Sequence, residues 1–160
     1  MVGVDTLGCA MVDRNQCSHL PAESAVTPQG CLAKDKHMEE TVRQPIDPLV
    51  SILVITYNQE AYIANTLESL LNQDCEFPYE ILVGEDCSTD GTRAICETYA
   101  SKYPDRIRLI ANPTNLGLMP NYLNLIRQAK GYYLSDCGGD DYWVAPDRLR
   151  RQVALLESHP

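Results

Sequence analysis

Two adjacent carboxylates, Asp140 and Asp141, are the side chains of this sequence best suited to chemistry. They follow a predicted buried strand and two glycines, Gly138 and Gly139. Like charges in contact repel, more strongly where water is excluded, so such a pair indicates either a solvated turn or a bound cation. Mg²⁺ and Mn²⁺ commonly take one or two protein carboxylates and complete their shell with water and phosphate oxygens. Because the glycines let a ligand approach the backbone, this stretch is a candidate metal site.

Two further side chains could recognise a nucleotide. Asp86 ends the apolar run 79–86, and a carboxylate there can accept a hydrogen bond from an imide N–H such as that of uracil. Tyr57 lies at the end of the first apolar run, and its ring can stack on a nucleobase, although an aromatic residue at a strand end more often only packs. Ser88 and Asp90 follow Asp86, and capping of the next helix is enough to account for them.

Several catalytic motifs are absent from the sequence. It has no GxGxxG after its first predicted strand, no GxxxxGK[ST] and no GxSxG, which removes dinucleotide-binding, P-loop and serine-hydrolase sites. Its seven cysteines form neither a CxxC pair nor a zinc-type cluster with histidine. Their odd number favours free thiols in a reducing cytosol, so a cytoplasmic location is expected.

Composition restricts the partners of the chain. Its 160 residues suffice for one domain with a core, and its formal charge of −9 argues against nucleic acid as a partner, because phosphate binding needs a face rich in Lys and Arg. An anionic small molecule would need a cation or backbone N–H groups instead. Residues 1–14 lack the basic start of a signal peptide, and no apolar stretch approaches the roughly 20 residues of a membrane-spanning helix.

The elements that must position the candidate residues alternate in type. The predicted strands are 49–58, 79–86, 107–112 and 131–137, and the predicted helices are 60–73, 90–103, 118–129 and 145–160. Four such alternations predict an α/β domain with a parallel sheet and helices on its faces. Ligands of these sheets bind at the carboxyl ends of the strands, and polar clusters follow all four predicted strands. Residues 1–46 show neither the alternation of a strand nor the apolar stripe of a helix, and they are predicted to be a disordered or weakly ordered leader.

Apolar spacing also predicts the buried face of each helix. The expected buried positions are, helix by helix, Ile63, Leu67, Leu70 and Leu71; Ala94, Ile95, Thr98 and Tyr99; Leu118, Tyr122, Leu125, Ile126 and Ala129; and Leu149, Val153 and Leu156. The second helix is expected to start with Asp90 as its N-cap.

Four stretches match a known family in order and spacing. They are "VSILVITYNQEAYIANTLESLLNQ", "EILVGEDCSTDGTRAI", "NPTNLGLMPNYLNLIRQAKGYYL" and "GGDDYWVAPDRLRRQVALLESHP". Together they resemble the nucleotide-binding half of family 2 glycosyltransferases. The resemblance implies a Rossmann-like GT-A fold over residues 47–160, a mainly parallel sheet with helices on both faces, and an incomplete domain that lacks the acceptor half.

The resemblance also implies an activity. Family members transfer a sugar from a nucleotide-diphospho-sugar donor to an acceptor hydroxyl with inversion, using Mg²⁺ or Mn²⁺. The acceptor, whether a saccharide, a lipid or another hydroxyl compound, is left open. The resemblance points to cell-envelope polysaccharide biosynthesis and allows peripheral membrane association.

By position, the resemblance places the donor around several strand ends. Thr56 and Tyr57 would border the base, and Asp86 would hold it. Asp140 would contact the ribose, and Asp140 and Asp141 would hold the metal that bridges the diphosphate. The other expected donor-binding residues are Asn58, Glu60, Ser88, Asn115 and Gly117.

The sequence departs from the family pattern at two positions. The acidic motif commonly begins with a carboxylate where this chain has Gly138, and many relatives carry an Arg where it has Pro120. The general base that deprotonates the acceptor lies well downstream of the metal motif in this family. It is therefore expected beyond Pro160, and no catalytic residue is assigned within the chain.

Three alternative functions compete with the glycosyltransferase that the resemblance implies. A noncatalytic nucleotide-sugar-binding fragment is favoured by Gly138 and by the missing base. A nucleotidyltransferase would share the fold but should carry a glycine-rich basic loop where this chain has "TYNQEAY". A receiver-like signalling domain would need its acidic pair after the first strand and a Lys after a late strand, and neither is present.

Overall fold

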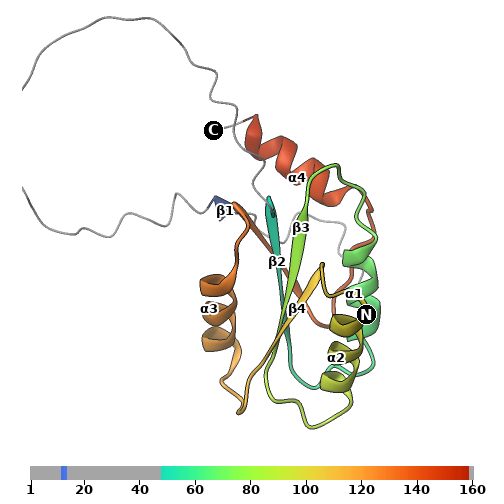
Figure 1. The fold of residues 1–160 in the computed structure, drawn as a ribbon, viewed down its shortest axis with the longest axis vertical. Helices are drawn as coiled ribbons and strands as arrows, with labels where there is room; N and C mark the ends of the chain where they lie inside the picture. The colour runs from blue at the N-terminus through green and yellow to red at the C-terminus, as the bar shows by residue number, and fades with distance from the viewer. Residues whose placement is uncertain (1–11, 14–47, 159–160) are drawn as a thin grey trace, which may run out of the picture.

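The computed structural model describes residues 12–13 and 48–158, which form five strands and four helices (Figure 1). In chain order these are β1 (Val12–Asp13), β2 (Val50–Thr56), α1 (Ile63–Leu71), β3 (Tyr79–Glu85), α2 (Thr92–Lys102), β4 (Ile107–Ala111), α3 (Leu118–Gln128), β5 (Tyr133–Gly138) and α4 (Arg148–Glu157). Apart from β1, the predicted leader 1–46 lies outside the described residues. No described helix combines the length and the apolar character needed to cross a membrane.

The strands form one sheet in the order β1-β5-β2-β3-β4. The pairs β5–β2, β2–β3 and β3–β4 are parallel, and β1 pairs antiparallel with β5. This arrangement confirms the predicted α/β fold with a mainly parallel sheet. The chain builds outward from β2 through β3 to β4 and then returns to the other side of β2, so the strand order reverses between β2 and β5. In such sheets the ligand site lies at the carboxyl ends of the strands flanking this switch point.

Helices cover both faces of the sheet (Figure 1). On one face α1, α2 and α4 pack over the side chains of alternate residues of β2, including Ile52 and Val54. On the other face Leu53 and Leu82 pack against Leu125 of α3. Because both faces are buried, β2 needs a continuous apolar run rather than an alternating one, which is what its sequence provides.

The predicted helix faces are correct for α1 and wrong in part for α2 and α3. Ala94 and Thr98 of α2 are exposed, whereas Thr92 and Cys96 are buried. The face of α2 that meets the sheet is short and partly polar, so apolar spacing alone gives the wrong register. In α3, Leu118 is 66% exposed because it begins the helix at the rim of the sheet.

Leu125 and Leu123 provide a test of the smaller core layer. We expect Leu125→Ala to lower the free energy of unfolding by about 2–5 kcal/mol, because it leaves a cavity between α3 and the sheet. Leu123 lies on the same helix and is 44% exposed, so Leu123→Ala should cost less than about 1 kcal/mol. Urea unfolding of both variants measures the difference, and equal losses would contradict the packing of α3 described above.

Candidate functional site

The register of the parallel strands brings the predicted site residues to one edge. Thr56 at the end of β2 lies opposite Glu85 at the end of β3, and Ile55 lies opposite Gly138 at the end of β5. The end of β2 and the loops that follow these strands carry eight of the predicted site residues: Thr56, Tyr57, Asn58, Glu60, Asp86, Ser88, Asp140 and Asp141. Asn115 and Gly117 come from the loop after β4 and therefore belong to the same edge.

Gly139 lies against the end of β2 with no room for a side chain. Its N–H donates to the carbonyl of Ile55 at 2.9 Å. A Cβ at Gly139 would lie 2.3 Å from Oε1 of Gln59 and 2.7 Å from Oγ1 of Thr56. Both oxygens are buried and have no hydrogen-bond partner among the residues that the structure describes, so there the junction holds two acceptors whose hydrogen-bonding capacity is unused.

The carboxylates of Asp140 and Asp141 converge beside Gly138. A Cβ at Gly138 would lie 3.0 Å from Oδ1 of Asp140 and 3.2 Å from Oδ2 of Asp141. Asp140 is exposed and Asp141 is half-buried, so both can reach a ligand. Two converging hard oxygen ligands fit a Mg²⁺- or Mn²⁺-type ion that takes its other ligands from water or phosphate. Within the described residues no group of three or more His, Cys, Asp or Glu side chains could hold a metal, so these two carboxylates would need such ligands.

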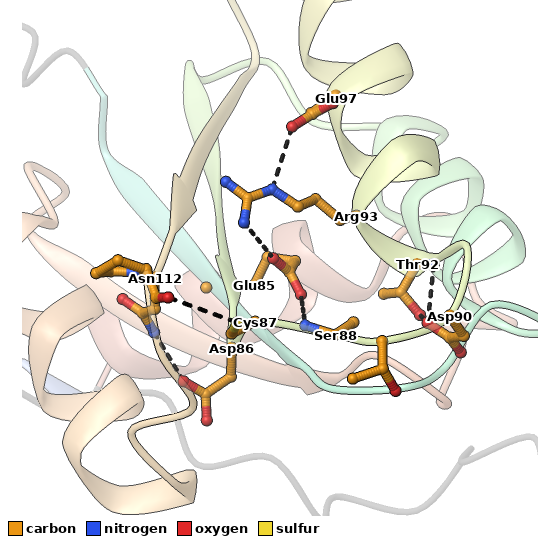
Figure 2. A network of polar contacts seen from close by, with 12 residues as sticks. Glu85, Asp86, Cys87, Ser88, Asp90, Thr92, Arg93, Glu97 and Asn112 are labelled. Carbon is orange, nitrogen blue, oxygen red and sulfur yellow. Dashed lines mark hydrogen bonds and ion pairs between the residues drawn. The ribbon is translucent and has the colours of Figure 1, made fainter.

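Asp86 is buried and organises the loop after β4 (Figure 2). Its Oδ1 accepts hydrogen bonds from Asn112 Nδ2 and from the N–H of Leu116, both at 2.9 Å. Its Oδ2 accepts one from the N–H of Gly117 at 2.8 Å. The carboxylate is 3% exposed and uses three of its roughly four acceptor positions within the protein. It therefore fixes the start of α3 as well as facing the site.

Asn112 and Asn121 extend this network into the core. Asn112 Nδ2 donates to Oδ1 of Asn121 at 3.0 Å, and Asn121 Nδ2 donates to the carbonyl of Gly84 at 2.9 Å. Asn121 lies in α3 and is fully buried, so the network ties that helix to β3 directly beneath Asp86.

Glu85 points to the opposite side of β3 from Asp86 (Figure 2). Its Oε1 accepts a hydrogen bond from the N–H of Ser88 at 2.6 Å, and its Oε2 lies 3.8 Å from Nη1 of Arg93. Arg93 also pairs with Glu97 at 3.2 Å. Burying a carboxylate without such partners would lower the stability of the fold. The bonds of Glu85 to Ser88 and Arg93 therefore help to hold the loop between β3 and α2 in place.

The loops after β2 and β3 are joined by hydrogen bonds that use several predicted donor-binding residues. Asn58, in a left-handed conformation with φ 52°, donates its N–H to Ser88 Oγ at 3.0 Å and accepts one from the N–H of Thr89 at 2.8 Å. Glu60 Oε2 accepts one from the N–H of Gly91 at 2.9 Å. Asn58, Glu60 and Ser88 thus hold the two loops together, whereas Tyr57 leaves its ring 45% exposed.

The remaining predicted donor-binding residues lie at the start of α3. Gly117, with φ 82°, precedes the helix, and its N–H is shared between Asp86 and Oδ1 of Asn115 at 3.0 Å. Pro120, at the second departure from the family pattern, lies in the first turn of α3 and is exposed. Asn115 is exposed as well, so the loop 113–117 forms an open wall of the site.

Two pKa shifts bear on the chemistry of this edge. Burial, with a further contribution from Glu85, raises the pKa of the Cys96 thiol to about 12, so this thiol stays protonated and is no nucleophile. The hydroxyl of Thr92 hydrogen-bonds Asp90 and lowers the pKa of that carboxyl. Asp90 is therefore charged at neutral pH. Its Oδ1 accepts a hydrogen bond from the N–H of Thr92 at 3.0 Å. The N-cap of α2 is nevertheless Gly91, one residue after the predicted Asp90.

Sequence reasoning missed four residues of the site. Glu85, Asn112 and Asn121 are polar and buried, and Gln59 lies against Gly139. Only Asn121 left a signal, because it lies four residues before Leu125 on the buried face of α3. Asn112 and Gln59 contact residues distant in sequence, Asp86 and Gly139, whereas Glu85 meets Ser88 and Arg93 a few residues downstream.

Comparison with known proteins identifies the family of the chain. The sequence model of glycosyl transferase family 2 matches residues 51–160. Uncharacterized protein Rv1520 of Mycobacterium tuberculosis is 43% identical over 111 residues, which are 69% of this chain and 32% of the relative. Putative glycosyltransferase EpsE of Bacillus subtilis is 41% identical over 112 residues, which are 70% of this chain and 40% of the relative. The chain thus spans well under half the length of these relatives.

Solved structures give the same result for the fold. Mannosyltransferase PcManGT from Pyrobaculum calidifontis, in complex with GDP-Man and Mn²⁺, superposes with a TM-score of 0.62 at 28% identity, over 69% of this chain and 32% of that one. TarS 1–349 of S. aureus superposes with a TM-score of 0.60 at 33% identity, over 69% of this chain and 32% of that one. The expected GT-A fold is confirmed by these structures, and by its sequence match the chain belongs to glycosyl transferase family 2.

Proposed function

We propose that this domain binds a nucleotide-diphospho-sugar at the carboxyl edge of its sheet and takes part in transferring the sugar to an acceptor hydroxyl with inversion. The convergence of Asp140 and Asp141 beside Gly138 is the observation that carries the proposal. These carboxylates follow β5 at the point where the strand order reverses, which is where open α/β sheets bind ligands.

The ligands of similar structures support a nucleotide-linked sugar as the donor. GDP-Man accompanies PcManGT, and UDP-GlcNAc accompanies TarS. We place the base between the exposed ring of Tyr57 and the carboxylate of Asp86, whose Oδ2 has one acceptor position left. The remaining donor-binding residues are proposed to shape the site through the loops they hold: Thr56, Asn58, Glu60, Ser88, Asn115 and Gly117.

Asp140 and Asp141 are the residues that would hold Mg²⁺ or Mn²⁺. The presence of Mn²⁺ with PcManGT and the two converging carboxylates of this chain both support a divalent ion. When bound, such an ion neutralises negative charge on a diphosphate leaving group. This supply of positive charge suits a protein whose own formal charge is −9.

In the proposed reaction the acceptor oxygen forms a bond to the anomeric carbon as the bond from that carbon to the diphosphate oxygen breaks. The nucleoside diphosphate leaves with the electron pair, and attack from the opposite face inverts the configuration. The acceptor proton passes to a general base. TarS is named poly(ribitol-phosphate) beta-N-acetylglucosaminyltransferase, and TuaG is named putative teichuronic acid biosynthesis glycosyltransferase. Both names support a role in cell-envelope polysaccharides.

A second candidate function is donor binding without transfer. Gly138, which stands where related motifs carry a carboxylate, favours it because only two carboxylates then face the metal. Release of sugar from UDP-GlcNAc and from GDP-Man, measured with and without saccharide acceptors, distinguishes the two functions. Metal-dependent release supports the enzyme, and tight binding of both donors without release supports the binding domain.

The acidic pair gives the first prediction about binding. We expect Asp141→Asn to weaken binding of UDP or GDP in the presence of Mn²⁺ by at least about tenfold, because a direct metal ligand should matter no less than its supporting residues. Isothermal titration calorimetry with and without Mn²⁺ measures the change.

Asp105 supplies the matched control for this experiment. It is exposed and precedes β4, at the opposite edge of the sheet, so Asp105→Asn removes the same charge without touching the site. Nucleotide binding that is indifferent to Mn²⁺, or that responds equally to both substitutions, would count against the proposed metal site.

Asp86 gives a second prediction, which concerns stability. Asp86→Asn turns an acceptor of three hydrogen bonds into a side chain whose NH₂ group, in either orientation of the amide, faces a backbone N–H donor, that of Leu116 or that of Gly117. We expect the free energy of unfolding to fall by about 1–3 kcal/mol. Urea unfolding beside Asp105→Asn measures this loss, and an unchanged midpoint would show that the carboxylate does not hold the loop.

A further inference from the structure

The loop that carries Asp140 and Asp141 is fastened along one side of α1. Thr66 and Ser69 lie one turn apart on that helix, and Gln73 follows just past its end. All three make hydrogen bonds to the segment between β5 and α4. The apolar side chains of the same helix, Ile63 and Leu67, pack in the core. One helix therefore connects the candidate metal ligands rigidly to the core.

Thr66 reaches the backbone on both sides of Asp140. Its Oγ1 lies 2.9 Å from the carbonyl oxygen of Gly139 and 2.5 Å from that of Asp141. The side chain is 1% exposed, so water does not compete for these carbonyls. A hydroxyl has one proton and donates to one of the two at a time. The peptide groups just before Asp140 and just after Asp141 are thus held by a single buried side chain.

This use of a helical threonine differs from the usual one. Thr98 of α2 shows the ordinary pattern, in which the hydroxyl donates to the carbonyl four residues earlier, that of Ala94, at 2.8 Å. For Thr66 the corresponding carbonyl, that of Tyr62, is 3.4 Å away, farther than either carbonyl of the acidic loop. The hydroxyl of Thr66 is therefore committed to the loop and not to its own helix.

Ser69 and Gln73 continue the attachment. Ser69 Oγ accepts the N–H of Trp143 at 3.0 Å and donates to the carbonyl of Thr66 at 2.7 Å. Gln73 Nε2 donates to the carbonyl of Ala145 at 3.1 Å, and its Oε1 accepts the N–H of Leu149 at 3.2 Å. The attachment thus runs from the acidic pair to the start of α4.

We propose that Thr66 is a positioning residue that sets the affinity of the Asp140–Asp141 pair for a divalent cation. The inference rests on the proposed function, because it assumes that the pair binds metal with a nucleoside diphosphate. Residues that orient metal ligands from behind commonly change metal affinity by 10–100-fold when they are removed. Thr66 touches neither carboxylate, so it acts through the backbone that carries them.

The test compares Thr66→Val, which loses the hydroxyl, with Thr66→Ser, which keeps it. Mn²⁺ is titrated into each variant in the presence of UDP and, separately, of GDP, and the free ion is counted by its electron paramagnetic resonance signal. We expect Thr66→Val to bind Mn²⁺ at least about tenfold more weakly and Thr66→Ser to bind as the unaltered chain does. Thr98→Val is the matched control and should change nothing.

Hydrogen exchange provides a measurement that needs no ligand. The amides of Asp141 and Trp143 should exchange faster in Thr66→Val, whereas those of β2 and β3 should keep their protection. Ser69→Ala, which removes the acceptor of the Trp143 N–H, should speed exchange at Trp143 and weaken Mn²⁺ binding by a smaller factor than Thr66→Val does. This second variant keeps the test decisive if Thr66→Val folds poorly.

The outcomes separate the inference from the proposed function. If the unaltered chain retains no Mn²⁺ with either nucleotide, the proposed function is overturned, and the role of Thr66 in metal binding with it. If the unaltered chain binds Mn²⁺ and Thr66→Val binds it equally well, only the inference is overturned. Equal losses in Thr66→Val and Thr66→Ser would overturn it too, because the hydroxyl would then not be the cause.

Discussion

The backbone of Gly139 meets the end of β2 so closely that no side chain fits between them, and the rest of the site depends on this contact. The N–H of Gly139 bonds Ile55, which locks the end of β5 to the end of β2. Asp140 and Asp141 therefore emerge at the switch point of the sheet. The backbone that carries them forms a closed turn, in which the Asp141 N–H donates to the carbonyl of Gly138 at 3.1 Å.

Around this contact the structure separates two kinds of acidic residue. Glu85 and Asp86 are adjacent in sequence, but each is buried with partners on its own side of β3 (Figure 2). Arg93 of α2 lies beside Glu85, and Asp86 accepts hydrogen bonds from the loop before α3. Asp140 and Asp141 keep much of their capacity to accept ligands. Buried carboxylates with partners shape the loops, and accessible ones are left for a cation. At this edge some acidic residues thus hold the loops in place, and others are available to bind a cation.

The sequence was informative where structure depends on local pattern and uninformative where it depends on distant pairing. The β-branched apolar run of β2 indicates a strand buried on both faces, and the polar clusters after each strand indicate the site edge. The face of α2 could not be read, because Thr92 is buried through its bonds to Asp90 and Gln59 and not through apolar spacing. Thr66 is an ordinary helical residue in the sequence, and only the fold brings the acidic loop to its hydroxyl.

The strand order also determines when the sheet can be completed. β5 occupies a central position beside β2, yet of the described strands it is the last to be synthesised. Until it arrives, the edge of β2 that includes Ile52 and Val54 has no neighbour to satisfy its backbone groups. Such long-range parallel pairing folds slowly and leaves an apolar edge open to self-association in the meantime. Before β5 is synthesised the nascent chain is therefore prone to aggregate, and the candidate metal ligands, which follow β5, take their places only after this strand has paired with β2.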